Sequence, residues 1–303
     1  MGGSGDREAY RPRPGGTAGP APAGEGRYPD RHPYPNPYPD RHARPVRRTV
    51  RRTLPVLLAF AVVLGGLAYF GDDLRELLGT APGSPRSRAA THGLHERAEP
   101  IDARCAGLPK DLDADAEASL TAFGRCLDRM WTSTLDRAGT EYAPPEQVRL
   151  VTSPSRAACG TGEHDWAGIY CSDSRVVNVL VEDGAVFPMM FTLAHEYAHH
   201  VQEVTGLADR RGSETFDEAW SRRLELQADC LAAATLRTVA PRRLERLRAL
   251  AGSRDADADD DVRADHRRSH GSGASGAEWM RRGQEEGSVA ACNTWGAPAG
   301  QVS

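Results

Sequence analysis

The chain has 303 residues, enough for one or two domains, and its 38 basic and 42 acidic side chains give a net charge of −4. This near balance excludes the overall basic character typical of nucleic-acid-binding proteins, so we expect no nucleic-acid partner. The charge is nevertheless unevenly distributed, because residues 1–53 contain 11 arginines against 5 acidic residues.

The N-terminal segment has the composition of a disordered tail. Its first 53 residues contain 10 prolines and 8 glycines, and Val46 and Val50 are its only aliphatic residues larger than alanine. Such a segment cannot bury enough apolar surface to offset the entropy of the chain. The sequence therefore predicts a disordered, Pro/Gly/Arg-rich tail over residues 1–52.

Residues 53–71 (TLPVLLAFAVVLGGLAYFG) contain no charged side chain. As a helix they span about 28 Å, close to the thickness of a bilayer core, which predicts a single transmembrane helix. Arginines precede the segment and Asp72 and Asp73 follow it, so the positive-inside rule predicts a cytoplasmic N-terminus and an extracytoplasmic remainder. A buried soluble helix and a cleaved signal peptide are the alternatives. The segment is apolar on every face and follows a long tail, which disfavours both.

Six cysteines lie after the predicted span, in a compartment where disulfides persist. They group along the chain as Cys105 with Cys126, Cys159 with Cys171, and Cys230 with Cys292. Fifteen pairings are possible for six cysteines, and the sequence alone does not choose among them. The pair that closes the short 159–171 loop is the one we favour.

The remaining chain is predicted to be a polar linker (72–100), one folded domain (101–296) and a short C-terminal tail (297–303). Apolar spacing and capping patterns predict helices over 113–137, 187–204, 215–239, 242–251 and 275–286. The third of these opens on a Thr215-x-x-Glu218 capping box. Segments 147–151 and 175–181 are predicted strands. The expected fold class is therefore α+β, mainly helical with a small sheet.

The predicted helix at 187–204 contains His195-Glu196-Tyr197-Ala198-His199, an H-E-x-x-H motif. Two histidines four residues apart project from one helix face and can share one Zn²⁺ ion. Glu196 lies beside that position and can act as the general base. The motif also arises by chance, in roughly one chain in fifty of this length and composition, so a third ligand must support it.

The segment LELQADC (224–230) offers that ligand on a second helix. Glu225 and Asp229 lie four residues apart among apolar residues, and a buried carboxylate requires a partner. We expect Glu225 to be the third metal ligand, and Asp229 to accept the free ring N–H of a ligand histidine. The alternatives are a surface ion pair of Glu225 with Arg222, or a ligand role for another acid: Glu203, Glu214 or Glu218. His200 is expected to point away from the metal.

HEYAHHVQ (195–202) followed by LELQADC resembles the putative neutral zinc metallopeptidase family, whose members are membrane-anchored bacterial proteins with a gluzincin-like motif. Other segments that agree are YAPPEQVRLV (142–151), ACG (158–160), YCSD (170–173), HGS (270–272) and CNTW (292–295). The resemblance implies a zincin-like domain over about residues 101–296. It also implies that His195, His199 and Glu225 bind zinc and that Glu196 is catalytic.

These observations together predict a membrane-anchored zinc peptidase that cleaves peptide or protein substrates outside the cytoplasmic membrane. The edge of the 175–181 strand is expected to bind an extended peptide, and His270 and Arg223 are candidates to stabilise the oxyanion. Two alternatives remain. One is a catalytically silent zinc-binding protein of the envelope, and the other is a zinc hydrolase of a non-peptide amide.

Overall fold

The computed structural model describes residues 7–10, 82–97, 100–159, 166–208, 217–253 and 267–303. All of them belong to one of the two compact units into which the chain divides, formed by Met1–Pro12 and Glu76–Ser303. The predicted transmembrane segment, residues 53–71, lies outside the described residues. Within the described ranges, none of the helices has the length and apolar character that crossing a bilayer requires.

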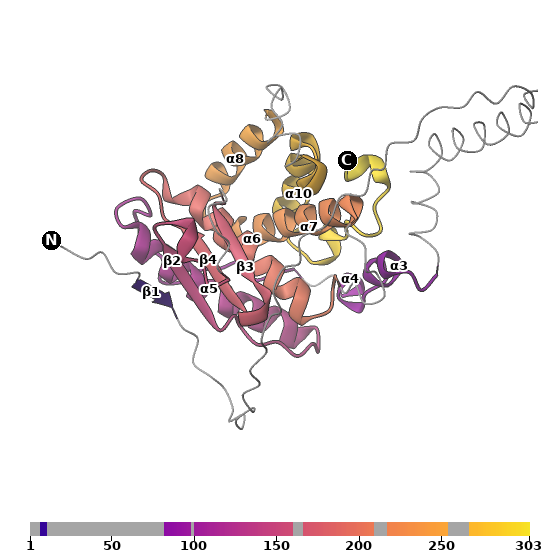
Figure 1. The fold of residues 1–303 in the computed structure, drawn as a ribbon, viewed down its shortest axis with the longest axis horizontal. Coiled ribbons are helices and arrows are strands. Elements are labelled where there is room, and N and C mark those ends of the chain that lie inside the picture. The colour runs from indigo at the N-terminus through magenta and orange to yellow at the C-terminus, as the bar shows by residue number, and fades with distance from the viewer. Residues whose placement is uncertain (1–6, 11–81, 98–99, 160–165, 209–216, 254–266) are drawn as a thin grey trace, which may run out of the picture. The chain divides into compact units, whose positions relative to one another are not determined.

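A sheet forms one side of this unit, with the strand order β1-β2-β4-β3 (Figure 1). Its strands are β1 (Arg7–Tyr10), β2 (Gln147–Val151), β3 (Gly168–Cys171) and β4 (Val176–Leu180). β2 pairs in parallel with β4, while β1–β2 and β3–β4 are antiparallel. β4 is therefore an interior strand, and β3 forms an edge.

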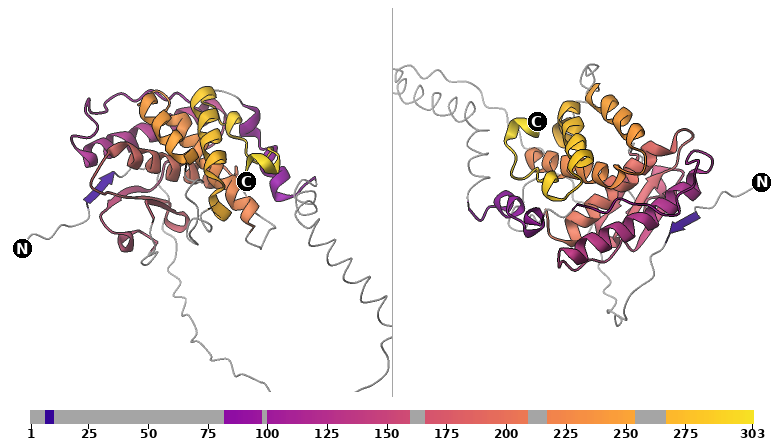
Figure 2. Two further views of the ribbon diagram at one scale, coloured as in Figure 1. Left: turned by 90° about the horizontal axis from the view of Figure 1, so that it is seen from above. Right: turned by 180° about the vertical axis from the view of Figure 1, so that it is seen from behind.

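Among the described residues, five longer helices build most of the rest of the unit. They are α5 (Ala116–Arg137), α6 (Val186–Val204), α7 (Glu218–Leu236), α8 (Pro241–Ser253) and α10 (Gly273–Glu286). α6 is central, because it packs against β3, β4, α5 and α7. α10 packs on α7, and α8 packs on α10, so these three helices lie beyond α6 as seen from the sheet (Figure 2).

Polar side chains fix where the two central helices begin. The backbone N–H of Val186, at the start of α6, donates to Asp113 at 3.0 Å, and Asp113 also pairs with Arg243 of α8 at 2.7 Å. Asp217 caps α7 by accepting from the Ala219 N–H. The helix therefore starts three residues after the predicted Thr215, which lies outside the described residues.

The three disulfides are Cys105–Cys126, Cys159–Cys171 and Cys230–Cys292, and no cysteine is free. The favoured 159–171 pair is confirmed, and the other two also join neighbours along the chain. Cys159–Cys171 ties the end of β3 to the loop that precedes it, and Cys230–Cys292 ties α7 to the C-terminal segment.

The domain extends beyond the predicted limits of 101–296. Two short helices, α3 (Pro85–Ala90) and α4 (Gly93–Glu96), lie in the segment predicted to be a linker, and their Ala89 and Leu94 are each only 2% exposed. At the other end, Val302 is buried and the Ser303 carbonyl accepts from the Ser272 N–H, so residues 297–303 are not a free tail. Linker and tail were predicted from composition, which does not register a few buried apolar contacts.

Two strands were also missed. β1 lies inside the segment predicted to be disordered, where the structure pairs residues 7–10 with β2, and the other residues of that tail lie outside the described ranges. β3 is four residues long and was predicted to be part of a loop. It is held by its pairing with β4 and by its packing on α6, neither of which appears in its own sequence.

Candidate metal centre

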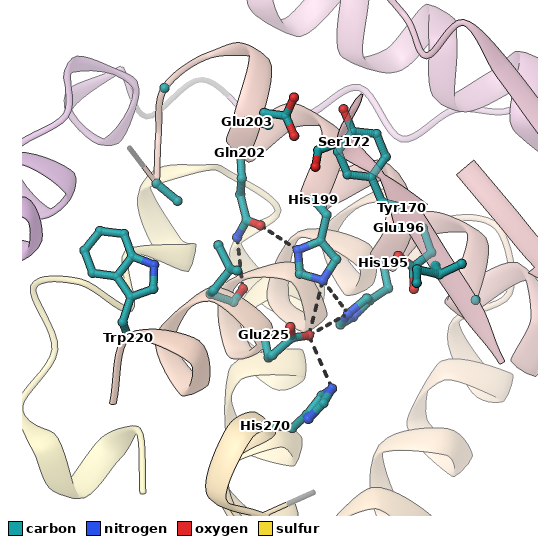
Figure 3. Close-up of a pocket in the computed structure, with 15 residues that line it drawn as sticks. Tyr170, Ser172, His195, Glu196, His199, Gln202, Glu203, Trp220, Glu225 and His270 are labelled. Carbon is teal, nitrogen blue, oxygen red and sulfur yellow. Dashed lines mark hydrogen bonds and ion pairs between the residues drawn. The ribbon is translucent and has the colours of Figure 1, made fainter. Parts of the chain in front are cut away.

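The two helices that carry the H-E-x-x-H motif and the predicted third ligand lie side by side and antiparallel. His195 of α6 lies beside Asp229 of α7. Seven residues further along α6, Gln202 donates at 2.9 Å to the carbonyl of Leu224, which lies five residues before Asp229 in α7. The helices therefore bring residues 30 positions apart in the sequence into one cluster (Figure 3).

Three donor atoms converge at the centre of this cluster. The Nε2 atoms of His195 and His199 lie 3.0 and 3.2 Å from Glu225 Oε2 and 3.0 Å from each other. Among the described residues, these three form the group whose donor atoms all lie within 4.8 Å of one another. The structure thus brings together the three ligands predicted from the sequence.

A second polar group holds the far nitrogen of each histidine. Nδ1 of His195 lies 2.9 Å from Asp229 Oδ1, as predicted, and Nδ1 of His199 lies 2.9 Å from Gln202 Oε1. Gln202 is fixed in turn, because its amide nitrogen donates to the Leu224 carbonyl and to Gln227 Oε1. When both rings donate from Nδ1, both Nε2 lone pairs face Glu225, the arrangement that a metal requires.

Glu196 lies between the two histidines and the edge strand β3. Its side chain is 7% exposed, lines the cleft and accepts a hydrogen bond from the Tyr170 backbone. Burial raises the pKa of Glu196 above its ordinary value, and the neighbouring His195 and His199 oppose that rise. The carboxylate is thus held beside the donor cluster without belonging to it.

The alternatives considered for Glu225 were an ion pair with Arg222 and a ligand role for another acidic residue. Arg222 pairs with Glu218 at 3.8 Å and donates to two carbonyl groups, so it does not form the ion pair considered for Glu225. Glu203 lines the cleft beside Tyr170 but lies outside the group of three donors. Glu214 lies outside the described residues.

His200 points away from the donor cluster, as expected. It is fully buried, with Nδ1 3.1 Å from the Tyr170 hydroxyl and Nε2 donating to the Ala143 carbonyl at 2.8 Å. Burial lowers its pKa to about 4, so it is a neutral packing residue.

The structure distinguishes between the two residues that were candidates for stabilising an oxyanion. Arg223 is 2% exposed and donates to the carbonyls of Thr294 and Ala297, so it does not line the cleft. His270 does line it, with Nε2 3.6 Å from Glu225 Oε2 and Nδ1 2.8 Å from the Ser269 hydroxyl.

The sequence did not reveal three further residues of the cleft: Tyr170, Gln202 and Trp220. Gln202 follows His199 by three positions, a spacing that places it on the same helix face, and this signal was available. Tyr170 belongs to the unpredicted strand β3. Trp220 reaches the cleft only through the packing of α7 on α6.

Comparison with known proteins agrees with this centre. The family model described as "Putative neutral zinc metallopeptidase" matches residues 51–295, and the chain belongs to that family. The family implies zinc, and the cluster of His195, His199 and Glu225 is a possible site for it.

The curated relatives are uncharacterized proteins. One from Mycobacterium tuberculosis is 29% identical over 168 residues, which cover 52% of this chain and 56% of the relative. The protein YpfJ of Escherichia coli is 25% identical over 193 residues, covering 55% of this chain and 67% of that protein. The match to the mycobacterial protein thus spans little more than half of its length. No solved structure matches the chain.

Proposed function

We propose that this chain is a zinc-dependent peptidase. The observation that carries the proposal is the position of Glu196 beside the two histidines and Glu225, in an open cleft of about 820 Å³. A structural zinc site is closed by four protein ligands, whereas three protein ligands beside an open cleft are typical of a catalytic site.

The residues of the cluster fit zinc. Two imidazole nitrogens and one carboxylate oxygen are its usual ligands, and the hydrogen bonds to Asp229 and Gln202 orient both rings. Zinc held there supplies a Lewis acid, which polarises a carbonyl group and acidifies water.

Glu196 has the position of the general base. Its carboxylate faces the cleft, so it can take a proton from the attacking water and pass it to the leaving amine. Its position favours this role, because the side chain lines the cleft next to His195 and His199 and is held by the Tyr170 backbone.

The edge strand β3 is the proposed support for an extended peptide. β4, which was predicted for this role, pairs on both sides with β2 and β3 and has no free edge. Gly168, Ile169 and Tyr170 of β3 line the cleft, so a peptide added to this edge lies beside Glu196. His270 is the proposed donor to the oxyanion, because it lines the cleft next to Glu225.

We also propose that residues 53–71 anchor the chain in the cell membrane with the domain outside. The uncharged segment and the pairing of all six cysteines support this arrangement. An anchored chain holds residues 7–10 across the bilayer from β2, so the β1–β2 pairing and the anchor exclude one another in a single molecule. Under this proposal the outer edge of β2 is open in the membrane-bound chain.

The test of peptidase activity is digestion of a peptide library by the purified full chain in detergent, with and without zinc. We expect cleavage that a chelator abolishes and added zinc restores. Glu196→Gln should keep about one zinc per chain and lose roughly 10²-fold or more in rate. Zinc binding without cleavage of any peptide would favour the silent interaction protein, and cleavage of non-peptide amides alone would favour the amide hydrolase.

A further inference from the structure

The cleft does not end at the donor cluster. It continues between the end of α6 and the start of α7, where it is lined by Gly206, Ala208, Trp220 and Leu224. Figure 3 shows Trp220 on the far side of Gln202 from His199. We call these four residues the far end of the cleft. None of them carries a charge, in contrast to the centre with its two histidines and two glutamates.

The wall of the far end is built mainly from packed apolar side chains. Trp220 packs on Trp295 with ring centroids 4.3 Å apart, and Ala89 of α3 completes this cluster, separate from the main core. Ala208 and Leu224 pack against the same cluster. The Trp295 ring is fixed by its N–H, which donates to Gln227 Oε1 at 3.1 Å.

The Gln202 amide, which lines the same cleft, has both of its N–H groups engaged. Both protons of the Gln202 amide are used by the Leu224 carbonyl and Gln227, and its oxygen accepts from His199. A polar side chain placed there would find no N–H donor on Gln202, whereas an apolar side chain would gain contact with the tryptophan.

We infer that the far end is a specificity subsite for a bulky aromatic or aliphatic side chain of a peptide substrate. This inference rests on the proposed peptidase function. Leu224 precedes Glu225, and its carbonyl accepts from Gln202, which holds His199, so the far end lies next to the donor cluster. We therefore place the selected residue at a position that flanks the cleaved bond. In an apolar pocket, one extra or missing methylene group typically changes kcat/KM by about 10–200-fold.

The test compares cleavage of a peptide library by the full chain and by two variants. Wild type should prefer phenylalanine or leucine over alanine at one flanking position, by about 10-fold or more in kcat/KM. Ala208→Phe fills the far end and should shift the preference to small residues. Leu224→Ala enlarges it and should weaken the preference for leucine. Leu244→Ala, a truncation of the same size in α8 and away from the cleft, is the matched control and should leave the preference unchanged.

A binding measurement separates failure of this inference from failure of the proposed function. Glu196→Gln protein should bind a peptide with a central phenylalanine about 10-fold more tightly than its alanine counterpart, and Ala208→Phe should remove the difference. Cleavage without apolar preference overturns the inference and leaves the peptidase standing. If wild type cleaves no peptide, the binding difference alone decides the inference, and equal or absent binding of the two peptides overturns it.

Discussion

Single residues define the candidate metal centre through helical spacing, and this is why much of its arrangement was predictable. His195 and His199 share a face because they lie four apart, and Glu225 and Asp229 share a face for the same reason. The sequence does not say that the two faces meet. The spacing of three places Gln202 on the face of His199, but glutamines are common in helices, so the sequence alone does not show that Gln202 holds His199 as Asp229 holds His195.

The different positions of Glu225 and Asp229 predict different losses of zinc affinity. Glu225 contributes an oxygen to the donor cluster, so Glu225→Ala should abolish stoichiometric zinc binding. Asp229 touches only the far nitrogen of His195, so Asp229→Ala should weaken zinc by roughly 10–100-fold. Competition with a chelator of known affinity gives the order, which should run wild type, Asp229→Ala, Glu225→Ala. Equal affinity of wild type and Glu225→Ala would move the third ligand elsewhere, with Glu203 the next residue to test.

At the scale of elements, the long helices were predictable because their apolar residues recur with helical period, and β2 was predicted at its observed limits. β3 was not, since GIYC is too short to show an alternating pattern. Its position depends on Gly168, where a Cβ atom would collide with the Thr192 side chain and come within 2.9 Å of Glu196 Cγ.

Gly168→Ala should therefore act on Glu196 through the contact between β3 and α6. The added methyl group must push the strand or the carboxylate aside, so we expect at least a roughly 10-fold loss of peptidase rate, in line with the sensitivity of catalysis to small displacements. Zinc affinity should stay near that of wild type, because no ligand is touched. Parallel loss of zinc and activity would show that the whole centre, not Glu196, depends on this contact.

α10 packs on α7 at a second glycine. A Cβ atom on Gly283 would collide with the Cys230 backbone carbonyl, which cannot move aside because Cys230 is inside α7 and bridged to Cys292. Gly283→Ala should lower the free energy of unfolding by about 1–3 kcal/mol, the usual cost of overpacking. Gly276→Ala is the control in the same helix, since its Cβ meets Asp229 at an ordinary 3.6 Å. Thermal unfolding of both variants should show the loss for Gly283→Ala alone.

At the scale of the whole molecule, folding keeps several histidines neutral. His95 donates from Nδ1 to the Val289 carbonyl, while its Nε2 is buried and lacks a hydrogen-bond partner among the described residues. Burial lowers its pKa to about 4 from an ordinary 6.5. Because this pKa is lower in the folded chain, the unfolded chain takes up the proton first as the pH falls.

The free energy of unfolding should consequently be independent of His95 above about pH 6.5 and decrease as the pH falls toward 4. His95→Gln should reduce the slope of the free energy of unfolding with pH by up to one proton taken up on unfolding. The pKa of His200 is also lowered to about 4, so the contribution of His200 to this slope remains in the variant. Urea unfolding at a series of pH values measures the slope. Identical slopes for His95→Gln and wild type would mean that His95 is protonated in the folded chain as readily as in the unfolded one.

The proposed orientation of the chain in a membrane can be tested at the scale of the whole molecule. An added cysteine is a selective label here, because all six native cysteines are in disulfides. Ser4 precedes the uncharged segment, and Ser303 is exposed at the other end of the chain. In intact cells that express the full chain, a membrane-impermeant maleimide should label Ser303→Cys. It should label Ser4→Cys only after the membrane is permeabilised, since the arginines before residue 53 favour the cytoplasm. Labelling of both in intact cells would place residues 7–10 and β2 on one side, where β1 can pair as the structure has it. Labelling of neither would place the domain in the cytoplasm, against the oxidised state of its cysteines.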